Sequence, residues 1–467
     1  MRVRFLRASS RLRAMPPVIC PSHCGSNSPT ITNSISNIRV QKTLIIESPK
    51  LKRRIGSQWD DCFPYYAGFP ESFASRIIET ASLSSKKAVI FDPWNGSGTT
   101  TYAAAKLGYN SHGMDLNPVM VLVARARALY PTEAGSIEPQ AKSLIKGIGA
   151  LKSNIEPSDP LLQWFTFSTA STIRNLERRI RNRLVSADTR RASFDFEEIS
   201  CFAATFYISL FSICRAFAKP FRSTNPTWLK IPKDSAKKIS LNASEILTAF
   251  VDQAKSMAIG LRSIDYSSVA SAKTEISVGN TTTLHRKNFA DLIITSPPYC
   301  TRIDYTAATR IELAVLHPLL DVSRETLSQQ MIGSIKVPNN SIVPDARWGN
   351  SCIEFLKRLE AHRSKASGGY YYKTHLDYFQ KMSKSMENVG ASLKKGGRAI
   401  LVVQDSYYKE LHNDVPLTLI EMAANCGLDL FHRVDFSKNN PMAAINPKSK
   451  NYRSTAKAVE SVICFKK

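Results

Sequence analysis

The alternation of apolar and polar positions becomes regular near residue 57 and predicts strands that alternate with helices. Residues 69–82 have apolar side chains at helical spacing, and the apolar run AVIFDP (88–93) predicts a buried strand. NGSGTTTYAAAKLG then predicts a helix that ends at Gly108, and SHGMDL predicts a second strand that ends at Asp115. This order is typical of the first half of a doubly wound α/β sheet.

A mainly helical insertion interrupts the sheet. Residues 169–186 and 240–258 repeat apolar side chains at helical spacing. The uncharged run 200–214 is shorter than the ~20 residues of a spanning helix, so it predicts a buried core helix rather than a membrane segment.

Beyond the insertion the strand pattern returns. TEISVGN and DLIITSPPY predict two strands, RAILVVQD a third, and LDLFHRVDF and AVESVICFK two closing strands. Residues 375–397 predict an amphipathic helix that ends at Gly396 or Gly397, and residues 414–427 predict another helix. We therefore expect a tail (1–56), a cofactor half (57–125), a helical insertion (126–270) and a catalytic half (271–467).

Charge narrows the class of partner. The 467 residues include 63 Lys and Arg against 38 Asp and Glu, a net charge of +25, which favours a polyanion such as nucleic acid. Nine cysteines without paired spacing argue against a disulfide framework and indicate a reducing cytoplasm. In CPSHC, Cys20, His23 and Cys24 lack a second ligand pair nearby, which disfavours a zinc site.

The first 45 residues contain several basic residues and no acidic residue. We expect this region to be a disordered basic tail. A transit peptide, a nucleic-acid-binding arm and an over-extended start upstream of Met15 all remain open for it.

DPWNGSGTT predicts a nucleoside pocket. Gly96 and Gly98 permit positive φ and close approach of the backbone to a ligand, but the lysine of a phosphate-binding loop is missing. Asp115, at the end of the next strand, has the position of an acid that accepts hydrogen bonds from ribose hydroxyls. This combination favours S-adenosylmethionine. Asn280, at the end of a third strand, predicts either a contact with the adenine edge or a turn.

TSPPY (295–299) after an apolar strand, together with DPWNGSGTT, resembles the amino-methyltransferases that modify exocyclic amines of DNA bases. FPESFASRII also resembles the helix before the glycine motif in that family. The resemblance covers about residues 57–125 and 270–467. It implies a Rossmann-like class I methyltransferase with a doubly wound, mostly parallel seven-stranded sheet. The implied cofactor site comprises Phe91, Asp92, Pro93, Gly96, Ser97, Gly98, Thr99, Asp115, Asn117 and Asn280.

The resemblance also assigns chemistry to the tetrapeptide. When the hydrogens of a delocalised amine bind two acceptors, the nitrogen becomes pyramidal and its lone pair can attack. By resemblance to the family, these acceptors are the Ser296 hydroxyl and the Pro297 carbonyl. Pro297 and Pro298 fix φ, so the carbonyl is already in place. Tyr299 offers a face on which a flipped base can stack, and an aromatic ring also attracts a sulfonium. The methyl group then passes directly to nitrogen.

Serine in first place leans toward cytosine N4 in this family, whereas Asp or Asn leans toward adenine N6. We expect cytosine N4 in double-stranded DNA, with adenine N6 as the alternative. A cytosine-C5 mechanism lacks its Pro-Cys nucleophile, because Cys300 follows Tyr299. The family departures are Trp94, where Phe is usual, and Asn280, where an acid is common.

The insertion is the expected target-recognition region. Its candidate DNA contacts are Arg174, Arg178, Arg181, Arg222, Trp228 and Lys230, and the basic loop 438–457 is a further candidate for phosphate contacts. For each contact, a solvated helix face or a packed tryptophan is an equally good interpretation.

A companion restriction endonuclease and the oligomeric state stay open. A non-catalytic nucleic-acid-binding or cofactor-sensing protein on the same fold is the alternative from another class, and the intact tetrapeptide argues against it.

Overall fold

The computed structural model describes residues 44–50, 63, 68–151, 155–185, 196–223, 228–264, 272–301, 304–338, 341–438 and 458–467. Residues 1–43, the Cys20, His23 and Cys24 cluster and nearly all of the loop 438–457 lie outside these ranges, so the expectations about them stay predictions.

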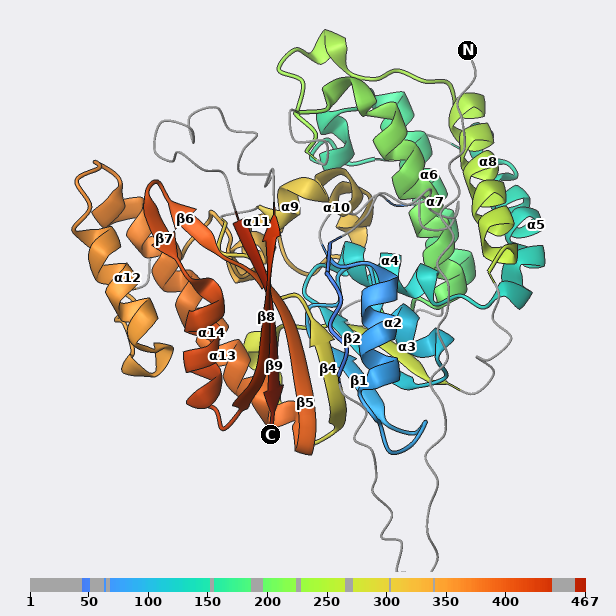
Figure 1. The fold of residues 1–467 in the computed structure, drawn as a ribbon. Helices are drawn as coiled ribbons and strands as arrows, with labels where there is room; N and C mark the ends of the chain where they lie inside the picture. Colours follow the sequence, from blue (N-terminus) through green and yellow to red (C-terminus); the bar gives the residue numbers. More distant parts are fainter. Residues whose placement is uncertain are drawn as a thin grey trace, which may run out of the picture. The chain divides into compact units, whose positions relative to one another are not determined.

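A seven-stranded sheet forms the centre of the described chain (Figure 1). Its strands are β1 (Val89–Asp92), β2 (Asn110–Asp115), β3 (Thr274–Val278), β4 (Ala290–Thr295), β5 (Leu393–Gln404), β8 (Asp429–Lys438) and β9 (Ala458–Lys466). The order is β3-β2-β1-β4-β5-β9-β8, and β9 runs antiparallel to both of its neighbours. This mostly parallel, doubly wound order confirms the predicted Rossmann-like fold of class I methyltransferases. A separate pair, β6 (Ser406–Tyr408) and β7 (Leu411–Asn413), forms a small hairpin.

Two helical layers cover the sheet because successive strand residues point to opposite faces. Ile90 and Leu292 pack toward α2 (Glu71–Thr80) and α3 (Thr99–Lys106). Phe91 and Ile293, one residue further along each strand, pack into the opposite layer. That layer contains α12 (Asn350–Glu360), α13 (Tyr372–Ser392) and α14 (Val415–Ala424).

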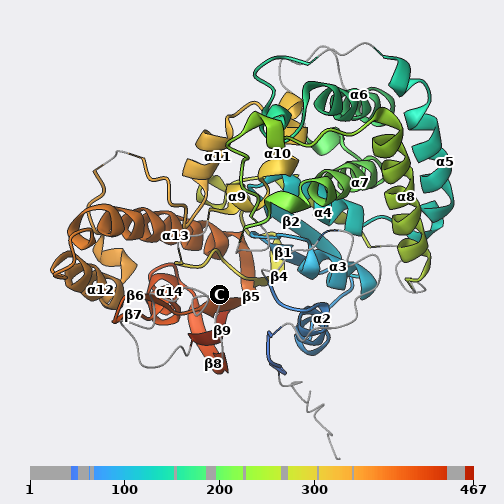
Figure 2. The same cartoon turned by 90° about the horizontal axis from the view of Figure 1, so that it is seen from above.

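The predicted insertion is helical and shares its core with the sheet domain. Its helices are α5 (Ala134–Ile145), α6 (Phe167–Leu184), α7 (Cys201–Phe217) and α8 (Ala243–Arg262). They gather on the side of the molecule away from α12 and α13 (Figure 2). One continuous apolar cluster joins them to α4 (Pro118–Arg127) and α10 (Arg310–Leu316), the latter from the catalytic half. The insertion is therefore packed onto one helix from each half of the sheet domain.

Buried ion pairs reinforce this junction. Arg174 of α6 donates to both carboxylate oxygens of Asp159 at 2.9 and 3.0 Å. The same guanidinium donates to the carbonyls of Ala314 and Val315 at the end of α10. Arg215 of α7 reaches Glu312 of α10 at 2.6 Å. Arg174 is only 3% exposed, so both of its expected roles, a DNA contact or a place on a solvated helix face, are wrong: α6 has packing partners on both sides.

The predicted end of the helix over 375–397 is also wrong. Helix α13 ends at Ser392, and Leu393 begins β5. Gly396 adopts φ +79°, and its N–H donates to the carbonyl of Lys467, while the Lys467 N–H donates to the carbonyl of Gly397. The two glycines therefore lie near the start of β5, where they pair with Lys467, and not at the end of a helix.

Within the described ranges, every helix is too short or too polar to cross a bilayer. Each cysteine that the structure describes is a free thiol, in agreement with the absence of paired spacing.

Replacing Arg174 with alanine tests its structural role. Arg174→Ala should lower the free energy of unfolding by about 3–5 kcal/mol, because it leaves the buried Asp159 carboxylate uncompensated. Arg183→Ala, on the exposed side of the same helix, should change it by less than ~0.5 kcal/mol. Equal free energies of unfolding for the two variants, measured by urea denaturation, would contradict the role.

Candidate active site

Three strands end together at the proposed site. In the sheet β1 lies between β2 and β4, and all three run parallel. Their last residues, Asp92, Asp115 and Thr295, therefore lie at the same edge, where doubly wound sheets bind their ligands. The glycine motif follows β1, and the tetrapeptide follows β4.

A direct hydrogen bond joins the two motifs. The Thr295 hydroxyl donates to Asp92 Oδ1 at 2.6 Å, and both side chains are buried. Asp92 Oδ1 also accepts from the Trp94 N–H at 3.2 Å. A second bridge runs from the Thr100 hydroxyl in α3 to the Ile294 carbonyl at 3.0 Å. The structure thus places the predicted cofactor turn and the predicted catalytic corner side by side.

Burial changes the titration of Asp92. Desolvation raises its pKa to about 6, although the hydrogen bonds from Thr295, Thr100 and Trp94 act in the opposite direction. Its carboxylate is therefore held by fixed donors inside the protein, which suits a residue that joins segments.

The glycine turn has no space for larger residues. Gly98 adopts φ +82° at the start of α3, and a Cβ added there would lie 2.8 Å from the Cβ of Ala124. Gly96 also has positive φ, 49°. These values satisfy the sequence prediction that both glycines are needed for the backbone to turn closely.

Asp115 is the group that best fits a ribose. Its two oxygens accept from the Gly96 N–H at 2.9 Å and the Asn117 N–H at 2.8 Å. The residue as a whole is half-buried. Desolvation raises its pKa to about 6, against the two backbone hydrogen bonds. A carboxylate that the glycine turn holds in this way is a suitable acceptor for the hydroxyl groups of a ribose.

Other predicted cofactor residues have their side chains engaged in the fold. Phe91 is fully buried and packs edge-on against Phe289 with ring centroids 5.0 Å apart. Asn117 caps α4 by accepting from Val119 N and donates to the Thr309 hydroxyl at 3.0 Å. The side chains of these two residues thus have partners within the fold, and their contact with a cofactor stays a prediction.

Asn280 and Ser97 also make local contacts. Asn280 Oδ1 accepts from the Thr282 N–H and hydroxyl at 3.0 and 2.8 Å, which is the turn interpretation of its sequence position. Ser97 accepts from Arg127 through its carbonyl and its hydroxyl. Pro93 is buried and Thr99 is half-buried in the turn.

Hydrogen bonds to neighbouring elements hold the tetrapeptide, residues 296–299, in place. Ser296 Oγ donates to the Val402 carbonyl at 3.0 Å, which leaves the oxygen lone pairs able to accept. Pro297 is buried, and the Pro298 carbonyl accepts from the Tyr378 hydroxyl at 3.1 Å. The Tyr299 N–H lies 3.4 Å from the Tyr305 hydroxyl.

Glu460 is a site residue that the sequence reasoning missed. The Tyr299 hydroxyl donates to Glu460 Oε1 at 3.1 Å, and Glu460, near the start of β9, is only 5% exposed. Burial and the adjacent Glu460 raise the pKa of Tyr299 well above its usual value. The available signal was an acid within the apolar run of a closing strand, because buried carboxylates are rare unless paired.

Two tyrosines were missed as well. Tyr305 lies near Asp115 and Tyr299, and burial raises its pKa to about 12. Burial also raises the pKa of Tyr378 well above its usual value. Both phenols therefore stay neutral hydrogen-bond donors, and no sequence pattern marked them.

The remaining expected DNA contacts lie on two parts of the insertion. Arg178 and Arg181 are half-buried on α6, where Arg178 donates to Asn175 and Arg181 lies 3.6 Å from Glu177. Arg222, Trp228 and Lys230 lie on two short segments, 221–223 and 228–230, that pair antiparallel. Arg222 and Lys230 are exposed there, whereas Trp228 is half-buried.

Comparison with known proteins agrees with the site. Residues 38–125 match the family model of the N6/N4 DNA methylases. This match includes the glycine motif and agrees with the resemblance seen in the sequence, and together with the relatives below it implies S-adenosylmethionine as the methyl donor.

Among its relatives, the Type II methyltransferase M.BsoBI of Geobacillus stearothermophilus is 25% identical over 370 residues, 74% of this chain and 68% of that protein. Type II methyltransferase M.AvaI of Nostoc sp. is 22% identical over 401 residues, 79% of this chain and 78% of that protein. The rRNA methyltransferase aviRa of Streptomyces viridochromogenes aligns over 86% of this chain and 87% of that chain at 9% identity, with a TM-score of 0.26. Because that score is low, the fold assignment rests on the strand order.

Asp115 gives a pH test of the cofactor site. Affinity for S-adenosylmethionine should fall as pH drops from about 7 to about 5, because protonation removes an acceptor whose pKa is about 6. Asp115→Asn should weaken binding about ten- to hundredfold at neutral pH, the loss of a charge-assisted hydrogen bond. It should also flatten the pH dependence in calorimetric titrations. A full pH dependence in this variant would assign the titration to another group, such as Asp92, and contradict the role.

Glu460→Gln tests whether the carboxylate positions Tyr299. Turnover should fall about tenfold, the equivalent of one weakened charge-assisted hydrogen bond, while the cofactor Kd stays unchanged. Adding Tyr299→Phe should cost little more, because the two changes remove the same contact. The matched control is Glu410→Gln, an exposed acid paired with His362. Additive losses would show that the two residues act independently.

Proposed function

We propose that this protein transfers a methyl group from S-adenosylmethionine directly to an exocyclic base amine of double-stranded DNA, with cytosine N4 as the target. The observation that carries the proposal is the 2.6 Å hydrogen bond between Thr295 and Asp92, which holds the cofactor turn against the tetrapeptide. A donor bound at one motif would lie beside an acceptor bound at the other.

The cofactor would be held by the glycine turn and by Asp115. Asp115 supplies an ionised acceptor for ribose hydroxyls, and Gly96 and Gly98 keep the turn free of side chains. When bound, the cofactor supplies an electrophilic methyl group on a sulfonium. The role of the chain is then to orient an amine toward that methyl group and to exclude water.

Ser296 and Pro297 would activate the amine. The Ser296 hydroxyl already donates to the Val402 carbonyl, so its oxygen can accept from an amine hydrogen. The Pro297 carbonyl is fixed by the ring torsions of two successive prolines. Two acceptors on the N–H groups would draw the nitrogen lone pair out of conjugation. The new N–C bond would form as the C–S bond of the sulfonium breaks, which would leave a neutral thioether, and one amine proton would pass to solvent.

Tyr299 would hold the flipped base. Its hydroxyl is tied to Glu460, so the ring orientation is set before the substrate arrives. An aromatic ring held in this way can stack on any base, so Tyr299 supports base flipping without selecting the base.

The preference for cytosine rests on Ser296. In this family, serine in first place of the tetrapeptide leans toward cytosine N4, and adenine N6 is the alternative. The relatives are named Type II methyltransferases, which supports a role in restriction–modification and a companion endonuclease as partner.

A non-catalytic role on the same fold is less well supported. A DNA-binding or cofactor-sensing protein would not need the anchoring of Ser296, Pro298 and Tyr299 by Val402, Tyr378 and Glu460. Three separate contacts that fix the four-residue corner favour catalysis.

The insertion would contribute to target recognition. With Arg174 engaged inside the fold, its exposed basic residues Arg222 and Lys230, beside Trp228, remain the better placed of the expected contacts. These paired segments place cationic and aromatic side chains together, a combination that suits contact with DNA.

A transfer assay separates these functions. The protein should move labelled methyl groups to double-stranded DNA, and nucleoside digestion with mass spectrometry should yield N4-methylcytosine. Ser296→Ala and Tyr299→Ala should lower the rate by at least about a hundredfold with unchanged cofactor affinity, whereas Ser351→Ala, at the distant start of α12, should retain it. N6-methyladenine would correct the base, and absence of any methylated base in wild-type reactions would favour the non-catalytic role.

A further inference from the structure

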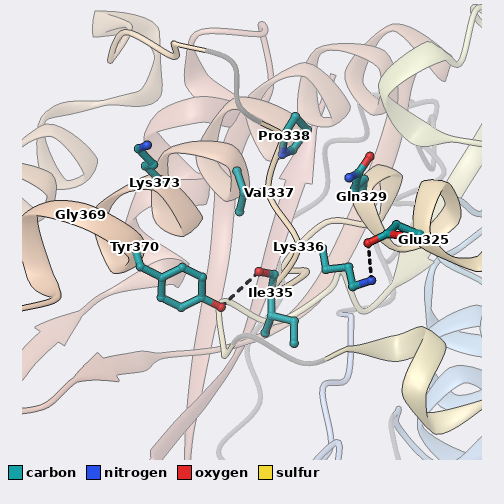
Figure 3. A pocket seen from close by; sticks show the side chains of 9 residues that line it. All are labelled: Glu325, Gln329, Ile335, Lys336, Val337, Pro338, Gly369, Tyr370 and Lys373. Carbon is teal, nitrogen blue, oxygen red and sulfur yellow. Dashed lines mark hydrogen bonds and ion pairs between the residues drawn. The ribbon is translucent and has the colours of Figure 1, made fainter.

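A hollow of about 510 Å³ is not used by the roles above (Figure 3). One wall is α11 (Arg324–Gln330), and the opposite wall is the single π-helical turn Ser367–Tyr371 with the first turn of α13. The segment 335–338 runs between the walls. The lining residues are Glu325, Gln329, Ile335, Lys336, Val337, Pro338, Gly369, Tyr370 and Lys373. We call this hollow the α11–α13 groove.

The segment along the groove begins at the catalytic corner. A Cβ on Gly333 would lie 2.9 Å from the Tyr299 carbonyl, so this glycine is pressed against the tetrapeptide. Lys336 follows after at most about 10 Å of extended chain. One wall is tied to the same corner, because Tyr378 of α13 donates to the Pro298 carbonyl. Lys373 lies about 7.5 Å before Tyr378 along the helix axis.

The charged groups of the groove are lysines and one carboxylate. Lys336 Nζ lies 2.7 Å from Glu325, whose side chain is 66% exposed. Lys373 is exposed on the facing wall. In Figure 3 the Lys336 side chain extends from the segment toward Glu325, and Lys373 lies on the other side of the segment. Glu325 neutralises part of this charge, so the groove has a modest net positive charge rather than a fixed anion site.

Tyr370 adds an ordered aromatic group. It is 44% exposed, and its hydroxyl donates to the Ile335 carbonyl at 3.1 Å, so the ring is held across the groove. It stands on a π-helical turn, a rare local structure that occurs often at functional sites. Beside it, a Cβ on Gly369 would meet nothing within 4 Å, so this side of the turn is open.

We propose that the α11–α13 groove binds the DNA strand that flanks the target base, with Lys336 and Lys373 on its phosphates and Tyr370 against a sugar or base. This inference rests on the proposed function and names a substrate contact for the same reaction. Lys336 lies at most about 10 Å of extended chain from Gly333 at the corner, which corresponds to at most about three base steps at 3.4 Å per step. The groove is lined by two lysines and one exposed ring, a combination that can track a nucleic-acid backbone without reading sequence. The net charge of +25 favours a polyanion over an acidic or neutral metabolite.

The test compares two charge-matched double variants of the full-length protein. Lys336→Gln with Lys373→Gln removes the groove cations. Lys87→Gln with Lys395→Gln removes two exposed cations near the amino ends of β1 and β5, at the opposite edge of the sheet. Binding to a fluorescent duplex is measured by anisotropy at several salt concentrations, and cofactor binding and thermal unfolding are measured alongside.

The groove variant should weaken DNA binding about tenfold and lower the slope of log K against log salt by about 2, one unit for each lost phosphate contact. The control pair should leave both unchanged, and neither pair should alter cofactor binding. Glu325→Gln should act in the opposite direction and tighten binding, because it removes the carboxylate paired with Lys336.

Two results would overturn the inference while leaving the methyltransferase intact. One is wild-type DNA affinity and salt slope in the groove variant. The other is unchanged DNA binding together with lost binding of a polyglutamate probe, which would assign the groove to an acidic protein. A wild-type protein that binds cofactor but no duplex would instead remove the proposed function itself.

Discussion

The hydrogen bond between the Thr295 hydroxyl and Asp92 is the contact on which the site depends. It joins the ends of two neighbouring parallel strands whose loops carry different chemistry. Because both side chains are buried, solvent does not compete with the bond, and burial raises the pKa of Asp92 to about 6. The sheet fixes the spacing of the strands, and this bond fixes how the two loops leave them.

Further hydrogen bonds connect the neighbouring elements. Asn117, just after β2, donates to the hydroxyl of Thr309 at the start of α10. The reversed strand β9 brings Glu460 to Tyr299 from the other side. The corner is thus held by parallel strands on one flank and by an antiparallel strand on the other. Under the proposed function, preorganisation of this kind would present the amine with acceptors that are already in position.

The sequence was sufficient to predict the seven strands of the main sheet and which polar residues follow their ends. Buried parallel strands read as continuous apolar runs, and ligand-binding residues follow their carboxyl ends, so Asp92, Asp115 and Ser296 could be placed before any coordinates. Arg174 was misplaced because helical periodicity distinguishes an apolar face from a polar one but not a second packing partner. The contact of Glu460 depends on tertiary pairing, and the α11–α13 groove on an irregular segment, so neither has a periodic signal.

A ligand-bound crystal structure tests most directly whether the cofactor site adjoins the tetrapeptide. With S-adenosylhomocysteine bound, its sulfur should lie within about 8 Å of Ser296 Oγ. That limit allows for one methyl group, an attacking nitrogen about 3–3.5 Å from it and one hydrogen bond. The ribose should contact Asp115. A ligand bound elsewhere, or a sulfur turned away from the Ser296 hydroxyl, would contradict the account.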